Sequence, residues 1–205
     1  MTPRSAAKGG ALRYAWIRAA GAGALLLARA HSAGGAGAMQ VRSPAFADGD
    51  AIPVRYSCQG EDISPPLSWD GVPPGARSLA LICDDPDAPM GAWVHWVAFD
   101  IPPELRALEE GVPAAERVEG RARQGMNDFG KVGYGGPCPP AGTHRYFFRL
   151  YALDKKLGLK GGVTKARLLK EMKGHVLAEG TLVGTYRKQD ERRGRGPARR
   201  GGAAR

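Results

Sequence analysis

From residue 39 onward, the sequence consists of short apolar runs separated by proline, glycine and aspartate. This arrangement is typical of an all-β protein, whose strands are short and joined by turns. Residues 78–83 form a continuous apolar run, which predicts a strand covered on both faces. Weaker strands are predicted at 52–57, 66–70 and 181–186. The pattern as a whole predicts an antiparallel β-sandwich.

Two further strands, at 93–99 and 144–153, are predicted from alternation, and each carries a histidine. Side chains two residues apart on a strand project from the same face. The expected neighbours on a shared face are Trp93 and Val97 for His95, and Tyr146 for His144. Both histidines are therefore expected to project from strands of the sandwich.

One or two short peripheral helices are predicted beside the strands. Thr164 is a suitable N-cap, and Gly174 can end a helical segment. Apolar residues recur at helical spacing at Leu169, Met172 and Val176. A shorter helical turn is expected around 104–110.

The net charge of +10 is concentrated at the two ends of the chain. Residues 1–38 hold five basic and no acidic residues, and residues 187–205 hold eight basic and two acidic ones. The stretch between them is nearly neutral, and no aromatic residues lie between the terminal arginines as stacking on bases would require. We therefore expect a folded domain at 39–188, a disordered Arg/Gly-rich tail at 189–205, and no specific nucleic-acid partner.

Residues 1–38 are expected to be a disordered basic leader, either an overextended reading frame or a weak signal peptide. Residues 19–28 resemble a short signal core and 36–38 a cleavage site, but no stretch approaches the roughly 20 apolar residues that span a bilayer. The prediction is a cytoplasmic protein without a transmembrane segment. The alternative is a periplasmic or secreted protein.

Three cysteines, Cys58, Cys83 and Cys138, are present without metal-type spacing. The odd count argues against a disulfide framework and predicts free thiols in a reducing compartment. Cys138 lies in a glycine- and proline-rich loop, where its thiol could be accessible.

Two loops are candidates for a binding site. Residues 84–89 place Asp85 and Asp87 beside prolines, which restrict the backbone and hold the carboxylates in defined directions. Residues 133–143 contain Gly135, Gly136 and Pro137, and glycines allow successive backbone N–H groups to face an anion. The second loop lacks the Gly-Lys-Ser/Thr pattern of nucleotide hydrolases.

Several segments together resemble the phosphatidylethanolamine-binding (Raf kinase inhibitor-like) family, particularly its shorter bacterial and archaeal branch. They are Asp85-Pro86-Asp87-Ala88-Pro89, Trp93-Val94-His95-Trp96, and Gly136-Pro137-Cys138-Pro139-Pro140 through His144-Arg145-Tyr146. The resemblance spans about residues 39–188. It implies a β-sandwich with a small pocket for phosphate-like anions, formed by Asp85, Trp93, His95, Gly136, Pro137, His144 and Tyr146.

The leading hypothesis is therefore a non-enzymatic protein that binds phosphate, a phosphorylated amine or a carboxylate without a metal or cofactor, and that modulates a partner enzyme. Two imidazoles near a carboxylate would be favoured as cations that receive an anion. The alternative is a hydrolase or metal-dependent enzyme that uses Asp85, His95 and His144, or Cys138 as a nucleophile activated by His144. Another protein or a second copy of the chain is an alternative partner.

Overall fold

A computed structural model describes residues 39–189, and the expectations for 1–38 and 190–205 lie outside this part of the chain. Within residues 39–189, no helix has the length and hydropathy that crossing a bilayer requires. The described residues are mostly strands, all paired antiparallel in two sheets. This confirms the predicted antiparallel β-sandwich.

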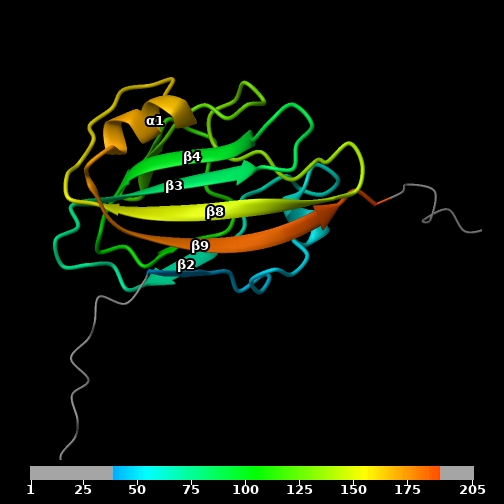
Figure 1. The fold of residues 1–205 in the computed structure, drawn as a ribbon, viewed down its shortest axis with the longest axis horizontal. Coiled ribbons are helices and arrows are strands. Elements are labelled where there is room, and N and C mark those ends of the chain that lie inside the picture. Colours follow the sequence, from blue (N-terminus) through cyan, green and yellow to red (C-terminus); the bar gives the residue numbers. More distant parts are fainter. Residues whose placement is uncertain (1–38, 190–205) are drawn as a thin grey trace, which may run out of the picture. The chain divides into compact units, whose positions relative to one another are not determined.

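The larger sheet has six strands in the order β6-β7-β4-β3-β8-β9. Their bounds are Arg117–Val118 for β6, Ala122–Gln124 for β7, Trp93–Ile101 for β4, Ser78–Asp85 for β3, Thr143–Leu153 for β8 and Val176–Arg187 for β9. The smaller sheet has the order β1-β2-β5, with bounds Gln40–Arg42, Leu67–Asp70 and Ala107–Leu108. Figure 1 shows β2 and the helix α1 (Lys165–Met172) on either side of the labelled strands of the larger sheet.

Each face of the larger sheet covers a separate hydrophobic core. One core fills the space between the two sheets and includes Leu81 of β3, Phe148 of β8 and Trp69 of β2. The other lies beneath α1 and includes Ile82 of β3 and Leu168 of α1. Because neighbouring residues of β3 enter different cores, the whole strand is buried, as the continuous apolar run predicts.

The helix begins where the sequence predicts, and ends earlier. The Thr164 hydroxyl accepts a hydrogen bond from the backbone N–H of Arg167 at 3.4 Å, which makes Thr164 the N-cap. Gly174 adopts a φ of +81°, which favours glycine and ends the helical path. Val176 therefore opens β9 instead of extending the helical face.

Two weaker predictions are wrong. Residues 52–57 do not form a strand, because Val54–Tyr56 form a 3-10 turn, η1, in which the N–H of Tyr56 donates to the Pro53 carbonyl. Residues 104–110 do not form a helical turn, because Ala107–Leu108 pair with β2 as strand β5. At 104–110, pairing with the distant strand β2, which local sequence does not report, decides the conformation. At 52–57, a local turn replaces the predicted strand.

Candidate functional site

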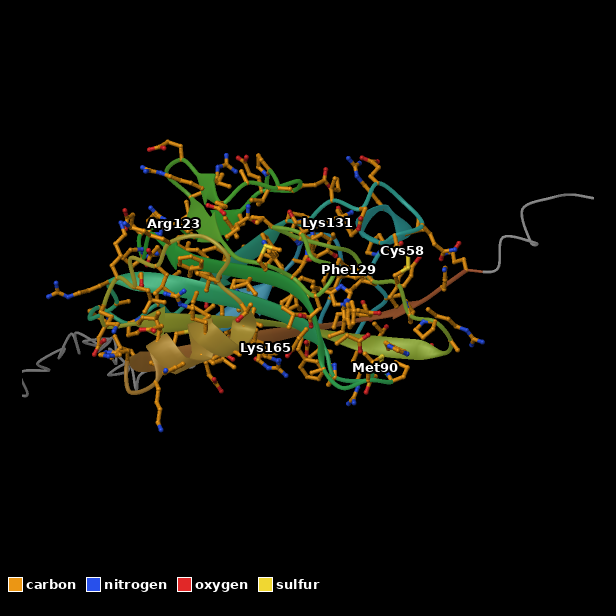
Figure 2. All side chains as sticks on the ribbon, turned by 90° about the horizontal axis from the view of Figure 1, so that it is seen from above. Cys58, Met90, Arg123, Phe129, Lys131 and Lys165 are labelled. Atoms are coloured by element: carbon orange, nitrogen blue, oxygen red, sulfur yellow. A yellow bond between two sulfur atoms is a disulfide. The ribbon has the colours of Figure 1, made fainter. Side chains whose placement is uncertain are left out.

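A cavity of about 320 Å³ lies at one end of the sandwich. It is bordered by the end of β3, the start of β4, the start of β8 and the loops between them. Its walls are formed by Asp85, Ala88, Pro89, Met90, Trp93, His95, Phe129, Cys138, Pro139, Pro140 and His144. Figure 2 shows Met90, Phe129 and Cys58 at this end of the domain, away from Arg123. The two candidate loops and the two histidine-bearing strands therefore meet at one hollow.

A β-bulge in β4 determines where His95 points. Trp96 pairs with Cys83 and Val94 pairs with Asp84, so His95 is an extra residue between two paired positions. As a result, Trp96 belongs to the core between the sheets, whereas Val94 and Val97 belong to the core beneath α1. The prediction that His95 shares a face with Val97 is wrong, because the bulge interrupts the alternation.

The His95 ring is buried and held by a backbone carbonyl. Its Nδ1 lies 2.6 Å from the Gly135 oxygen, and because a carbonyl only accepts, Nδ1 carries the proton. Burial lowers the pKa of His95 below its usual 6.5, against the opposing effects of the Gly135 carbonyl and of Asp85. His95 is thus favoured as a neutral ring, not as the cation expected from the sequence.

His144 and Asp85 form a buried pair at the cavity wall. The Nδ1 of His144 donates to Oδ2 of Asp85 at 2.7 Å, and the two side chains are 9% and 4% exposed. The other oxygen of Asp85 accepts the backbone N–H of Asp87 at 2.8 Å. The Nε2 atoms of His95 and His144 make no hydrogen bond within residues 39–189, so each is available to a ligand.

Two buried polar atoms lack a partner among residues 39–189: Nε1 of Trp93, which lines the cavity, and the hydroxyl of Tyr146. Tyr146, which the resemblance places in the pocket wall, is fully buried and is not one of the residues that line the cavity. Tyr146 packs edge-on against His95, with ring centroids 5.0 Å apart. Burial, followed by the charge and the proximity of the Asp85 carboxylate, raises the pKa of Tyr146 far above its usual 10, so the hydroxyl keeps its proton. The contact with Asp85 does not meet the geometry of a hydrogen bond. Both atoms are hydrogen-bond donors.

Asp87 lies outside the cavity wall. Its carboxylate accepts hydrogen bonds from the guanidinium of Arg145, at 2.9 Å and 2.7 Å, and from the Arg145 backbone N–H at 3.0 Å. These hydrogen bonds from Arg145 lower the pKa of Asp87 to about 2. The side chain thus ties the first candidate loop to β8.

Gly135, Gly136 and Pro137 support the cavity through their backbone. The Gly135 N–H donates to the His95 carbonyl at 2.9 Å, and the Gly136 N–H donates to Asp62 at 2.6 Å. A Cβ on Gly136 would lie 2.4 Å from the carbonyl oxygen of Tyr56, so close packing against η1 requires glycine here. These two amides are engaged within the protein, unlike the anion-facing amides expected from the sequence.

Phe129 is a wall residue that sequence reasoning missed. It lies edge-on to Trp93 and to His95, with ring centroids 5.5 Å and 5.2 Å away. The Asn127 side chain accepts the backbone N–H groups of Phe129 and Lys131 and thereby shapes the turn that presents Phe129. The Asn-Asp-Phe-Gly sequence signals a turn, but nothing in it indicates a position beside the two histidines.

The cysteine prediction is wrong for two of the three residues. Cys58 and Cys138, whose sequence separation is 80, form a disulfide with Cα atoms 5.5 Å apart, whereas Cys83 is a buried free thiol. Cys138 is therefore not a nucleophile in this structure. The three cysteines are therefore one disulfide pair and one thiol buried in the core.

A metal site of three or more histidine, cysteine or acidic ligands is not present within residues 39–189. Asp85 directs one oxygen to His144 and the other to the Asp87 amide. The alternative of a metal site built from Asp85, His95 and His144 is therefore not supported by the geometry.

The carboxylate next to Asp85 points to the opposite face of the sheet. Asp84 is 4% exposed and pairs with both Arg149 of β8 and Lys165 of α1. Arg149 also lies over the ring of Phe147, 4.6 Å from its centroid. Asp84 thus connects α1 to the sheet, while Asp85 faces the cavity.

Comparison with known proteins gives consistent matches. The family model described as phosphatidylethanolamine-binding protein matches residues 42–187. A UPF0098 protein from Methanothermobacter thermautotrophicus is 59% identical over 150 residues, which cover 73% of this chain and 99% of that protein. A UPF0098 protein from Aquifex aeolicus is 49% identical over 153 residues, or 73% of this chain and 89% of that one.

Two solved structures share the fold. A phosphatidylethanolamine-binding protein homologue from Chlamydia trachomatis has a TM-score of 0.69 and 47% identity, and the match covers 74% of this chain and 99% of that chain. YbcL from Escherichia coli, described as a member of the mammalian family, has a TM-score of 0.69 and 30% identity, covering 75% and 100%.

Proposed function

Because the chain belongs to the phosphatidylethanolamine-binding protein family, we propose that it binds a small anionic group and is not itself an enzyme. The ligand class is phosphate, a phosphorylated amine or a carboxylate. The cavity beside Asp85, His95 and His144 is the proposed site. Through this binding the protein would modulate a partner.

The observation that carries the proposal is a buried donor without a partner in the cavity wall, Trp93 Nε1, together with a second one, the Tyr146 hydroxyl, on a ring packed against the wall residue His95. A buried donor without an acceptor costs about 1–3 kcal/mol, which a ligand oxygen can recover. His144, oriented by Asp85, supplies a third group at the same hollow. Such a set of donors suits an oxygen-rich anion.

The walls also restrict the ligand. Apolar side chains dominate them, among which Phe129, Pro139 and Trp93 surround the few polar atoms. A volume of about 320 Å³ is at the small end of the range for ligand pockets. The proposed ligand is therefore a small anion that carries at most a compact apolar substituent.

Catalysis is disfavoured by the state of the candidate nucleophile. The Cys138 sulfur is bonded to Cys58, so no thiol faces His144. The described cavity wall offers no serine, threonine or lysine as a substitute. Nucleophilic catalysis needs such a group next to a base. The remaining candidate in the wall, the Asp85 carboxylate, is engaged by His144 and by the Asp87 amide.

The disulfide bears on the compartment. Disulfides persist in oxidising environments and are rare where glutathione keeps thiols reduced. The Cys58–Cys138 bridge therefore favours the periplasmic or extracellular alternative over the cytoplasmic prediction.

The binding proposal is tested by NMR titration of the full chain with inorganic phosphate and with O-phosphoethanolamine. The expected result is saturable shifts of the His95 and His144 ring signals, with a weakening of about tenfold or more in His144→Ala. His175→Ala is the matched control, because His175 also pairs with an aspartate, at 2.8 Å, but lies outside the cavity. Unchanged spectra at millimolar concentrations of both probes would contradict the proposal.

A further inference from the structure

We propose that the Cys58–Cys138 disulfide is a thiol-exchange site that holds one wall of the cavity in place, so that its reduction releases this wall. The wall in question is the segment 138–142, which contributes Cys138, Pro139 and Pro140 to the cavity. The expected effect of reduction on ligand affinity rests on the proposed anion-binding function, whereas the expected release of the wall does not.

The segment 138–142 has few other attachments. Residues just before it are well anchored, because the Pro137 carbonyl accepts the Cys58 N–H at 3.1 Å and the Gly136 N–H donates to Asp62 at 2.6 Å. From Cys138 to Gly142, no hydrogen bond is made within the described part of the chain. Regular pairing begins again at Thr143, opposite Arg187. Pro139 is buried, whereas Pro140, Ala141 and Gly142 are exposed. The lateral connections of this segment are thus the disulfide and the packing of Pro139.

The other end of the bridge is firmly held. Cys58 follows Ser57, whose hydroxyl donates to the Val54 carbonyl at 2.7 Å and lies 2.7 Å from the Tyr186 hydroxyl of β9. The Gln59 backbone N–H donates to the same Ser57 oxygen at 3.2 Å. The turn around Cys58 therefore keeps its position without the bridge, and the mobile partner after reduction is 138–142.

The bridge is accessible to a thiol. Cys58 is exposed, and Cys138 is partly exposed. A thiolate of a dithiol reductant attacks the Cys58 sulfur and forms a mixed disulfide, while Cys138 leaves as a thiolate. The second thiol of the reductant then displaces Cys58, so the reductant is oxidised to a disulfide and its two protons pass to the two cysteines.

The test compares backbone NMR order parameters of the oxidised chain, the chain treated with dithiothreitol, and the double variant Cys58→Ser with Cys138→Ser. We expect order parameters at Ala141 and Gly142 to fall from about 0.85 to below about 0.6 in the last two samples. Leu81 and Phe148, which are fully buried in the sheet, should keep their values. Dithiothreitol should cause no further change in the double variant.

The second measurement is sulfate affinity in the same three samples, which we expect to fall at least fivefold when the bridge is absent. Unchanged order parameters at 138–142 would overturn the proposal. An equal loss of order at Leu81 and Phe148 would also overturn it, because the disulfide would then stabilise the whole fold instead of this wall. If the wall is released but the sulfate affinity is unchanged, the claim that the disulfide affects anion binding is overturned. If sulfate and phosphate bind to none of the samples, the anion-binding function fails, while the order parameters still decide the thiol-exchange site.

Discussion

The Nδ1 atom of His144 lies 2.7 Å from Oδ2 of Asp85, and both side chains are almost fully removed from solvent. The same contact recurs between His175 and Asp154 at 2.8 Å, where the side chains are 37% and 45% exposed. The two pairs thus share one geometry in different surroundings. Only the buried pair adjoins the cavity.

We expect Asp85→Asn to weaken phosphate binding by at least about tenfold, because a charge-assisted hydrogen bond that orients His144 is worth about 1.5–3 kcal/mol. Isothermal titration calorimetry with phosphate measures the change. Asp154→Asn is the matched control and should bind phosphate as the unmodified chain does. Equal affinities for the two variants would show that Asp85 does not orient the binding group.

The second prediction concerns the pH dependence of stability. Burial lowers the pKa of His95 below 6.5 in the folded state, so the unfolded chain binds the proton more readily. The free energy of unfolding should therefore be unaffected by His95 above pH 6.5 and should fall as the pH drops from 6.5 to the lowered pKa. Each unit by which the pKa is lowered corresponds to about 1.4 kcal/mol.

Urea unfolding between pH 7.5 and pH 5, with the disulfide intact, measures this dependence. In His95→Gln the decrease in stability below pH 6.5 should be smaller than in the unmodified chain. An identical slope for both proteins would mean that His95 does not stay neutral in the fold.

The third prediction separates two buried tyrosines. The Tyr146 hydroxyl has no partner within residues 39–189, whereas the Tyr186 hydroxyl lies 2.7 Å from Ser57 Oγ and 2.9 Å from Gln59 Oε1. We expect Tyr146→Phe to leave the free energy of unfolding unchanged or slightly higher, and Tyr186→Phe to lower it by about 1 kcal/mol.

For phosphate affinity, we expect the larger effect from Tyr146→Phe and the smaller one from Tyr186→Phe. Tyr146→Phe removes an unpartnered donor on the ring that packs against His95 and should weaken binding severalfold, while Tyr186→Phe should have little effect. Chemical denaturation and titration calorimetry on both variants test these expectations. A stability loss in Tyr146→Phe comparable to that in Tyr186→Phe would indicate that the Tyr146 hydroxyl has a partner in the free protein.

The fourth prediction concerns Asp84, the buried partner of Arg149 and Lys165. Asp84→Asn should destabilise the fold by about 3 kcal/mol, because removal of one member of a buried ion pair leaves the others uncompensated. The exposed pair of Arg42 and Asp70 offers the comparison, since Asp70→Asn should cost less than about 1 kcal/mol. Thermal unfolding measures both, and phosphate affinity should be unchanged in Asp84→Asn.

The sequence predicts the strands that form the centre of the larger sheet because their apolar runs are long and their composition matches a covered strand. It also identifies Asp85, Trp93, His95 and His144, which line one cavity. The features that the sequence does not predict depend on contacts between distant segments. The Cys58–Cys138 bridge spans 80 residues, and the amide of Gly136 is occupied by Asp62.

The neutral state favoured for His95 also follows from tertiary structure. A period of two predicts the direction of a strand residue only while pairing is regular, and the register shift between Cys83 and Asp84 breaks that condition. The ring is thereby enclosed between Tyr146 and Phe129. Local sequence around His95 contains no glycine or proline that would signal the bulge.

The extra residue in β4 makes the direction of the imidazole depend on the length of the strand as well as on the histidine itself. Removal of Val94 would let the strand resume continuous pairing while turning His95 toward the helix-covered face. Among natural relatives, a shortening by one residue at this point would thus abolish the site while preserving the sandwich, even though every other wall residue remained.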